Sequence, residues 1–167
     1  MKFVSLSFLA LSAMFALGCS TESGSEPTHP HGESPDGSST FECSSDPRVQ
    51  SYVANLEKNG VLNRARFTLT SADPAPPRRG FNNWTLNIVD SAGNPIPNPT
   101  VTISGMMPDH QHGWSTQPTL TAGADGKSFT VEKIYLSMGG VWEVTFDVTS
   151  DGSSTLLDKA TFTFCIG

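Results

Sequence analysis

The chain has 167 residues, a formal net charge of -6 and 16% charged residues. An acidic sequence without a basic run argues against binding to nucleic acid and against electrostatic attachment to anionic lipid. Its one long apolar run, residues 3–17, is shorter than the roughly 18 residues of a membrane-spanning helix, so we expect no transmembrane segment.

The first 18 residues have the pattern of a secretory signal, with Lys2 before the apolar run. The run ends in Ala16-Leu17-Gly18-Cys19, which resembles the bacterial lipobox, although the usual first residue of that box is Leu. Ser20 follows the cysteine, and by resemblance to lipoprotein sorting in Gram-negative cells this directs the protein to the outer membrane, facing the periplasm. We therefore expect residues 1–18 to be a lipoprotein signal peptide and Cys19 to carry the lipid that anchors the protein in the cell envelope. The alternative is an ordinary signal peptide cut elsewhere.

Residues 19–40 consist mainly of Ser, Thr, Gly, Glu and Pro. Such a segment cannot bury enough apolar surface to offset the entropy of ordering, so we expect a disordered tether. His29 and His31 lie within it, either as solvated linker residues or as groups that help to collect a metal ion.

Two cysteines remain after Cys19, at Cys43 and Cys165. An even pair in an oxidising compartment predicts a disulfide. By chain entropy, a bridge across about 120 residues stabilises a domain by roughly 4 to 5 kcal/mol. The alternative is a copper site made of the two thiols.

The remaining segment, residues 41–167, is predicted to form one folded domain. Asp46 and Pro47 resemble the start of a helix, residues 49–56 carry apolar side chains at helical spacing, and Asn59-Gly60 would end it. Beyond this point apolar and polar residues alternate and turn signals separate the runs, which predicts about seven strands. We therefore expect an all-β fold, an immunoglobulin-like antiparallel β-sandwich with one short N-terminal helix. The alternating apolar residues are Ala65, Phe67 and Leu69; Trp84, Leu86 and Ile88; Val101 and Ile103; Phe129 and Val131; Trp142, Val144, Phe146 and Val148; and Phe162 and Phe164.

Several motifs between residues 84 and 148 occur in the same order as in the YtkA-like domain, which is related to FixH-type proteins. The resemblance implies a small β-sandwich facing the envelope, with a loop of Met-Pro-x-His type associated with copper handling or with assembly of cytochrome oxidase. A copper-handling or oxidase-assembly protein is then the implied partner. The motifs are Trp84-x-Leu86-x-Ile88-x-Asp90-x-x-Gly93-x-Pro95, Val101-x-Ile103, Met107-Pro108-x-His110-x-His112-Gly113 and Met138-Gly139-Gly140-Val141-Trp142.

The densest group of potential metal ligands lies in residues 104–114, which Gly and Pro mark as a loop carried by strands. Imidazoles combined with soft, uncharged thioethers favour Cu(I) over Zn(II), which prefers thiolates, imidazoles and carboxylates. We therefore predict a site that binds or transfers Cu(I), formed by Met106, Met107, His110 and His112 with help from Met138.

The same residues also have a simpler interpretation. A methionine of this loop could fill the end of the core, and a histidine could fix the turn through the backbone. The protein would then be a structural or protein-interaction module without a metal. Asp109, the histidines and nearby serines include the residue types of a hydrolase, but no catalytic spacing accompanies them, so we predict that the protein is not an enzyme.

Overall fold

The computed structural model describes residues 43–167. The predicted signal peptide (residues 1–18), the lipidated Cys19 and the tether (residues 19–40) lie outside this range. Within it, no helix has the length and apolar character needed to cross a membrane.

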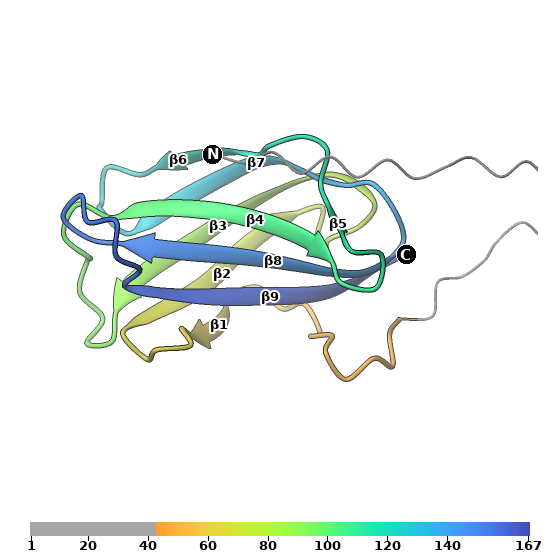
Figure 1. Cartoon of the computed structure of the whole chain (residues 1–167), viewed down its shortest axis with the longest axis horizontal. Coiled ribbons are helices and arrows are strands. Elements are labelled where there is room, and N and C mark those ends of the chain that lie inside the picture. The colour runs from red at the N-terminus through yellow and green to blue at the C-terminus, as the bar shows by residue number, and fades with distance from the viewer. Residues whose placement is uncertain (1–42) are drawn as a thin grey trace, which may run out of the picture. The chain divides into compact units, whose positions relative to one another are not determined.

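Residues 43–167 form two antiparallel β-sheets that lie face to face (Figure 1). The first sheet has five strands in the order β1-β2-β3-β7-β6, and the second has four in the order β5-β4-β8-β9. The strands are β1 (Leu56–Asn59), β2 (Ala65–Asp73), β3 (Gly80–Asp90), β4 (Thr100–Met107), β5 (His112–Gly113), β6 (Thr119–Ala122), β7 (Ser128–Leu136), β8 (Gly140–Thr149) and β9 (Asp158–Ile166).

The hydrophobic core lies between the sheets and follows the predicted alternation. In β8 the side chains of Trp142, Val144, Phe146 and Val148 are all buried. The ring of Trp84 in the first sheet packs 6.4 Å from that of Phe146 in the second, measured between centroids. Because successive strand residues face opposite sides, each strand contributes every second side chain to this core. The prediction of an all-β fold with two antiparallel sheets is confirmed.

The predicted N-terminal helix is wrong. Residues 46–55 contain no helix, and β1 occupies Leu56–Asn59. The Gln50 amide donates to the Thr163 carbonyl of β9 at 2.9 Å, and its side-chain oxygen accepts from the Thr163 amide at 3.1 Å. The Tyr52 hydroxyl accepts a hydrogen bond from the Ala72 amide of β2 at 2.9 Å. These contacts with two strands outweigh the weak local helix propensity of the segment.

A disulfide joins Cys43 to Cys165, across a sequence separation of 122 residues and a Cα–Cα distance of 5.4 Å. It links the first described residue to the end of β9. The cysteine count therefore predicted the pairing correctly, and the described domain is closed covalently at its two ends.

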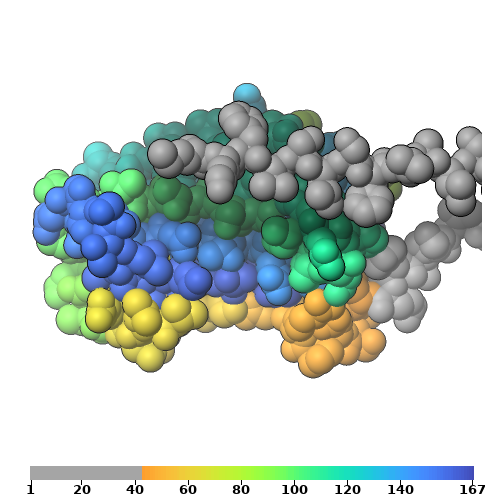
Figure 2. All heavy atoms as spheres, viewed as in Figure 1, coloured from red at the N-terminus to blue at the C-terminus, as the bar shows by residue number. Residues whose placement is uncertain are grey.

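One end of the two sheets carries the predicted metal loop. Met106 of β4 pairs with Glu143 near the start of β8, so the loop after β4 lies beside the turn between β7 and β8. The Arg79 side chain of the β2–β3 loop donates from Nε to the Ser137 carbonyl of that turn at 3.0 Å. In Figure 2 the first described residues adjoin the segment around residue 110 at this end. Three loops and the disulfide therefore lie at this end of the sheets.

Candidate metal site

A tight turn brings the two histidines together. Residues 108–111 connect β4 to β5, and the His110 amide donates to the Met107 carbonyl at 3.1 Å. Gln111 has a positive φ of 54°, which turns the chain back toward β4. The ring centroids of His110 and His112 lie 5.9 Å apart, with 51° between the ring planes. The proximity of the two rings therefore arises from a turn within the predicted loop.

His112 is held by three kinds of contact. It pairs with Met107 across β4 and β5, and its ring contacts that of Trp142 in a T-shaped arrangement with 6.2 Å between centroids. Its Nδ1 lies 3.0 Å from the Gly113 carbonyl oxygen. Since a carbonyl only accepts, this contact requires the proton on Nδ1, which leaves the lone pair of the neutral ring on Nε2. A ring oriented in this way is suited to bind a metal through Nε2.

The two methionines of β4 lie on opposite faces of their sheet. Met107 is 1% exposed and belongs to the hydrophobic core, whereas Met106 is 45% exposed. Met107 pairs with His112 and therefore shares its face, while Met106 pairs with Gly113 and Glu143. The structure consequently places Met107 next to His112 and Met106 on the other face. The five predicted ligands are not gathered at one point.

Met138 lies in the turn between β7 and β8, at the same end as the histidines. Its side chain is exposed, and its carbonyl accepts a hydrogen bond from Trp142 Nε1 at 3.0 Å. The same indole contacts the ring of His112. Trp142, a fully buried residue of β8, therefore links the Met138 turn to the histidine loop.

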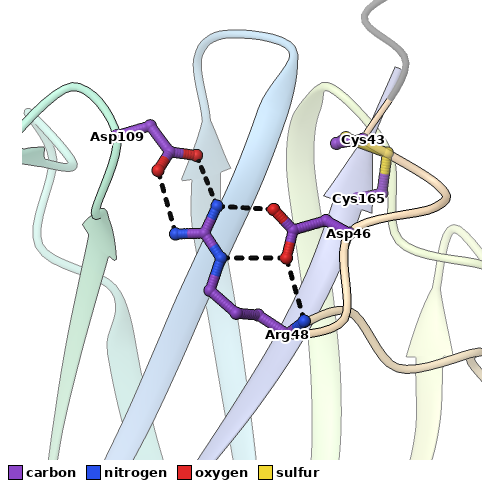
Figure 3. A network of polar contacts seen from close by, with 5 residues as sticks. All are labelled: Cys43, Asp46, Arg48, Asp109 and Cys165. Carbon is purple, nitrogen blue, oxygen red and sulfur yellow. Dashed lines mark hydrogen bonds and ion pairs between the residues drawn. A yellow bond between two sulfur atoms is a disulfide. The ribbon is translucent and has the colours of Figure 1, made fainter.

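Arg48 fixes the loop from outside. Its guanidinium donates two hydrogen bonds to Asp109, from Nη1 at 2.9 Å and from Nη2 at 2.8 Å, and it also binds Asp46 through Nε at 2.9 Å and Nη2 at 2.6 Å (Figure 3). These hydrogen bonds lower the pKa of Asp46 to about 2 and also lower that of Asp109. The two carboxylates in turn raise the pKa of Arg48. We call Asp46, Arg48 and Asp109 the carboxylate clamp.

The sequence did not reveal this clamp. Asp46 resembled a helix cap, and Arg48 and Asp109 are 61 residues apart. The disulfide and the two turns of residues 43–49 bring Arg48 to that position.

The donors fit a metal with few ligands. A metal lies roughly 2 Å from a ligating imidazole nitrogen and hence roughly 3.2 Å from the ring centroid, so two rings on one ion have centroids at most about 6.4 Å apart. The observed 5.9 Å between His110 and His112 falls within that limit. Within residues 43–167, no three His, Cys, Asp or Glu side chains are grouped to hold a metal, and the two cysteines of this range are joined in the disulfide. The available donor groups therefore match a metal site of two imidazoles and a thioether better than they match the closed four-ligand site of Zn²⁺.

Fold and site together define a two-sheet β protein with a histidine turn between its fourth and fifth strands. The profile of the YtkA-like family matches residues 61–147, which is more than half of the chain. The chain belongs to the YtkA-like family, and the resemblance seen in the sequence motifs is confirmed.

Two solved structures of FetP from uropathogenic E. coli resemble the chain distantly. FetP as isolated after expression in the periplasm shares 13% identity, with 65% of this chain and 95% of FetP covered and a TM-score of 0.39. A copper-bound FetP variant shares 11% identity, with 71% and 95% covered and the same TM-score. At this similarity neither structure supports an argument about what this chain binds. No curated protein sequence matches the chain significantly.

Proposed function

We propose that this protein binds a single Cu(I) ion through His110 and His112 and passes it to a partner in the cell envelope. The observation that carries the proposal is the imidazole pair, with 5.9 Å between ring centroids and His112 Nδ1 committed to the Gly113 carbonyl. Two neutral nitrogen donors suit a soft monovalent ion, whereas a harder divalent ion generally needs more ligands or carboxylates.

A thioether is the natural third ligand. Met107 is the cross-strand neighbour of His112, and Met138 lies beyond the indole that contacts the same ring. Met107 is fully buried and contributes to the core, so Met138, which is 41% exposed, is the better candidate for an exchangeable ligand. Met106 lies on the other face of the sheet and is not part of the proposed site.

The architecture that carries this site is proposed to be immunoglobulin-like. The order β2-β3-β7-β6 in one sheet and β4-β8-β9 in the other supports this classification, because it corresponds to the A-B-E-D and C-F-G sheets of a constant-type immunoglobulin domain. We further propose a non-enzymatic role and attachment through a lipid on Cys19, at the outer membrane facing the periplasm in a Gram-negative host.

The test is anaerobic titration with Cu(I) in competition with a chromogenic chelator. The protein would begin at residue 19 and carry Cys19→Ser, which removes the one thiol that lies outside the disulfide. The chain has four histidines in all, so H29A/H31A is a matched control for H110A/H112A. We expect one competitive equivalent of Cu(I) in the parent and in the control and none in H110A/H112A.

The thioether has its own matched pair. M138L should weaken Cu(I) binding, whereas M106L, an equally exposed residue on the other face, should leave it unchanged. Copper retained in full by H110A/H112A would refute the proposed site. No competition by the parent protein would leave the structural or protein-interaction role.

A further inference from the structure

His110 and His112 are held in different ways. His112 is fixed by strand pairing, by the Gly113 carbonyl and by the indole of Trp142. His110 lies in the turn, where the backbone bond from its amide to the Met107 carbonyl spans only three residues. Its neighbour Asp109 is bound at both carboxylate oxygens by Arg48. The clamp is therefore a long-range contact that acts on the His110 side of the pair.

Arg48 is itself held firmly in place. The Asp46 amide donates to the Cys43 carbonyl at 3.1 Å, and the Val49 amide donates to the Asp46 carbonyl at 3.0 Å. The disulfide fixes the beginning of this segment, and the bond from Gln50 to Thr163 of β9 fixes its end. Figure 3 shows the guanidinium between the two carboxylates, with the disulfide a few residues upstream. A planar fork that binds two carboxylates sets a direction as well as a distance.

The clamp is poorly placed to stabilise the fold. The side chains of Arg48 and Asp109 are 39% and 51% exposed, so solvent screens their attraction and limits what the pair contributes to folding. The bidentate geometry fixes the orientation of the Asp109 carboxylate, and we infer that this contact mainly orients the loop.

We propose that Arg48 is a positioning residue of the metal site, anchored by the Cys43–Cys165 disulfide, and that it holds His110 at ligating distance from His112 through Asp109. This inference rests on the proposed function, and it adds a residue far from the loop in sequence. Loss of a group that orients a ligand typically weakens metal affinity by about tenfold or more.

The test compares R48Q with R78Q, which removes an exposed arginine outside the clamp, in the same Cys19→Ser protein. The first readout needs no metal: NMR contacts between the rings of His110 and His112 and between His112 and Trp142. We expect R48Q to lose the first contact, to keep the second and to keep the melting temperature of the parent. The second readout is Cu(I) affinity, which we expect to fall about tenfold in R48Q and not in R78Q. D109N should have the same effect, and the double variant R48Q/D109N should be no weaker than either single variant.

An R48Q protein that keeps the His110–His112 contact, or that loses it without any change in Cu(I) affinity, would overturn the inference and leave the proposed function intact. A parent protein without affinity for Cu(I) would remove the proposed function. In that case the NMR contact between the rings of His110 and His112 would alone show whether Arg48 positions the loop.

Discussion

The buried carboxylate of Asp158 offers the sharpest test of what holds the two sheets together. Asp158 is fully buried at the start of β9. Its Oδ1 accepts from the amides of Leu62 and Lys159, both at 2.8 Å, and its Oδ2 accepts from Arg64 at 2.8 Å and from Ala65 at 2.9 Å. A Cβ at Gly60 would lie 2.1 Å from the Asp158 carboxyl carbon, so the β1–β2 loop wraps tightly around this group.

Substitution D158N replaces one of the two oxygens by an amide NH₂, which cannot accept from the two N–H groups that point at it. Hydrogen bonds to a charged group contribute about 1.5–3 kcal/mol each, so losing two costs roughly 3–6 kcal/mol. The variant no longer buries a charge, which offsets part of that cost. We expect a net loss of about 3 kcal/mol in the free energy of unfolding, measured by urea denaturation.

The control is D147N, which neutralises a partly exposed aspartate of β8, in the same sheet as Asp158 but on its outer face, and should change little. A D158N protein as stable as D147N would refute the role of Asp158 in holding the β1–β2 loop.

The pH dependence of stability gives a second check. Burial opposes ionisation of Asp158, but the four amide donors prevail and lower its pKa below the ordinary 3.8. Its contribution to stability is therefore present above about pH 4 and lost as the pH falls through the lower folded pKa. D158N should lack that component of acid unfolding. Because Asp158 pairs with Val148 at the end of β8 remote from Met138, Cu(I) affinity of the folded variant should be unchanged.

Three further outcomes are expected. In R48Q the pKa of the Asp46 carboxyl, which the Arg48 side chain and backbone amide together lower to about 2, should rise toward 3.8 when followed by ¹³C NMR, because only the backbone bond remains; an unchanged midpoint would contradict the clamp. In G105A the new Cβ would lie 2.2 Å from Trp114 Cε3, so the indole must move, and we expect a loss of about 2 kcal/mol in urea denaturation with a shifted Trp114 resonance. In W142F the bond to the Met138 carbonyl is lost and the smaller ring leaves a cavity in the core, so stability should fall by more than the roughly 1 kcal/mol of the hydrogen bond alone. The amides of the β7–β8 turn should exchange faster, whereas unchanged exchange would exclude the proposed link.

Much of the fold was readable because burial imposes a period of two on each strand. The alternation around Trp84 and around Trp142 corresponds to β3 and β8. The short strands β1, β5 and β6 were not predicted, since two to four residues carry too little pattern. The prediction of a helix after Asp46 was wrong for a related reason. The spacing of apolar residues within a segment carries no information on the hydrogen bonds that Gln50 and Tyr52 make with strands distant in sequence.

The candidate site was readable only in part. His110 and His112 are close in sequence, which predicted that their side chains would share one site. The turn between β4 and β5 brings their rings together. The same strand logic that predicted β4 also requires adjacent residues to face opposite ways, so Met106 and Met107 could not both join one site. Arg48 could not be predicted, because its position depends on the disulfide and on two turns in a segment where the sequence predicted the start of a helix.

Cu(I) bound by two imidazoles of one turn has a characteristic X-ray absorption spectrum at the copper edge. In the Cu(I)-loaded protein we expect multiple scattering from two imidazole rings, together with a sulfur shell that disappears in M138L and persists in M106L. A spectrum without imidazole scattering, or one unchanged in H110A/H112A, would contradict binding of Cu(I) by His110 and His112.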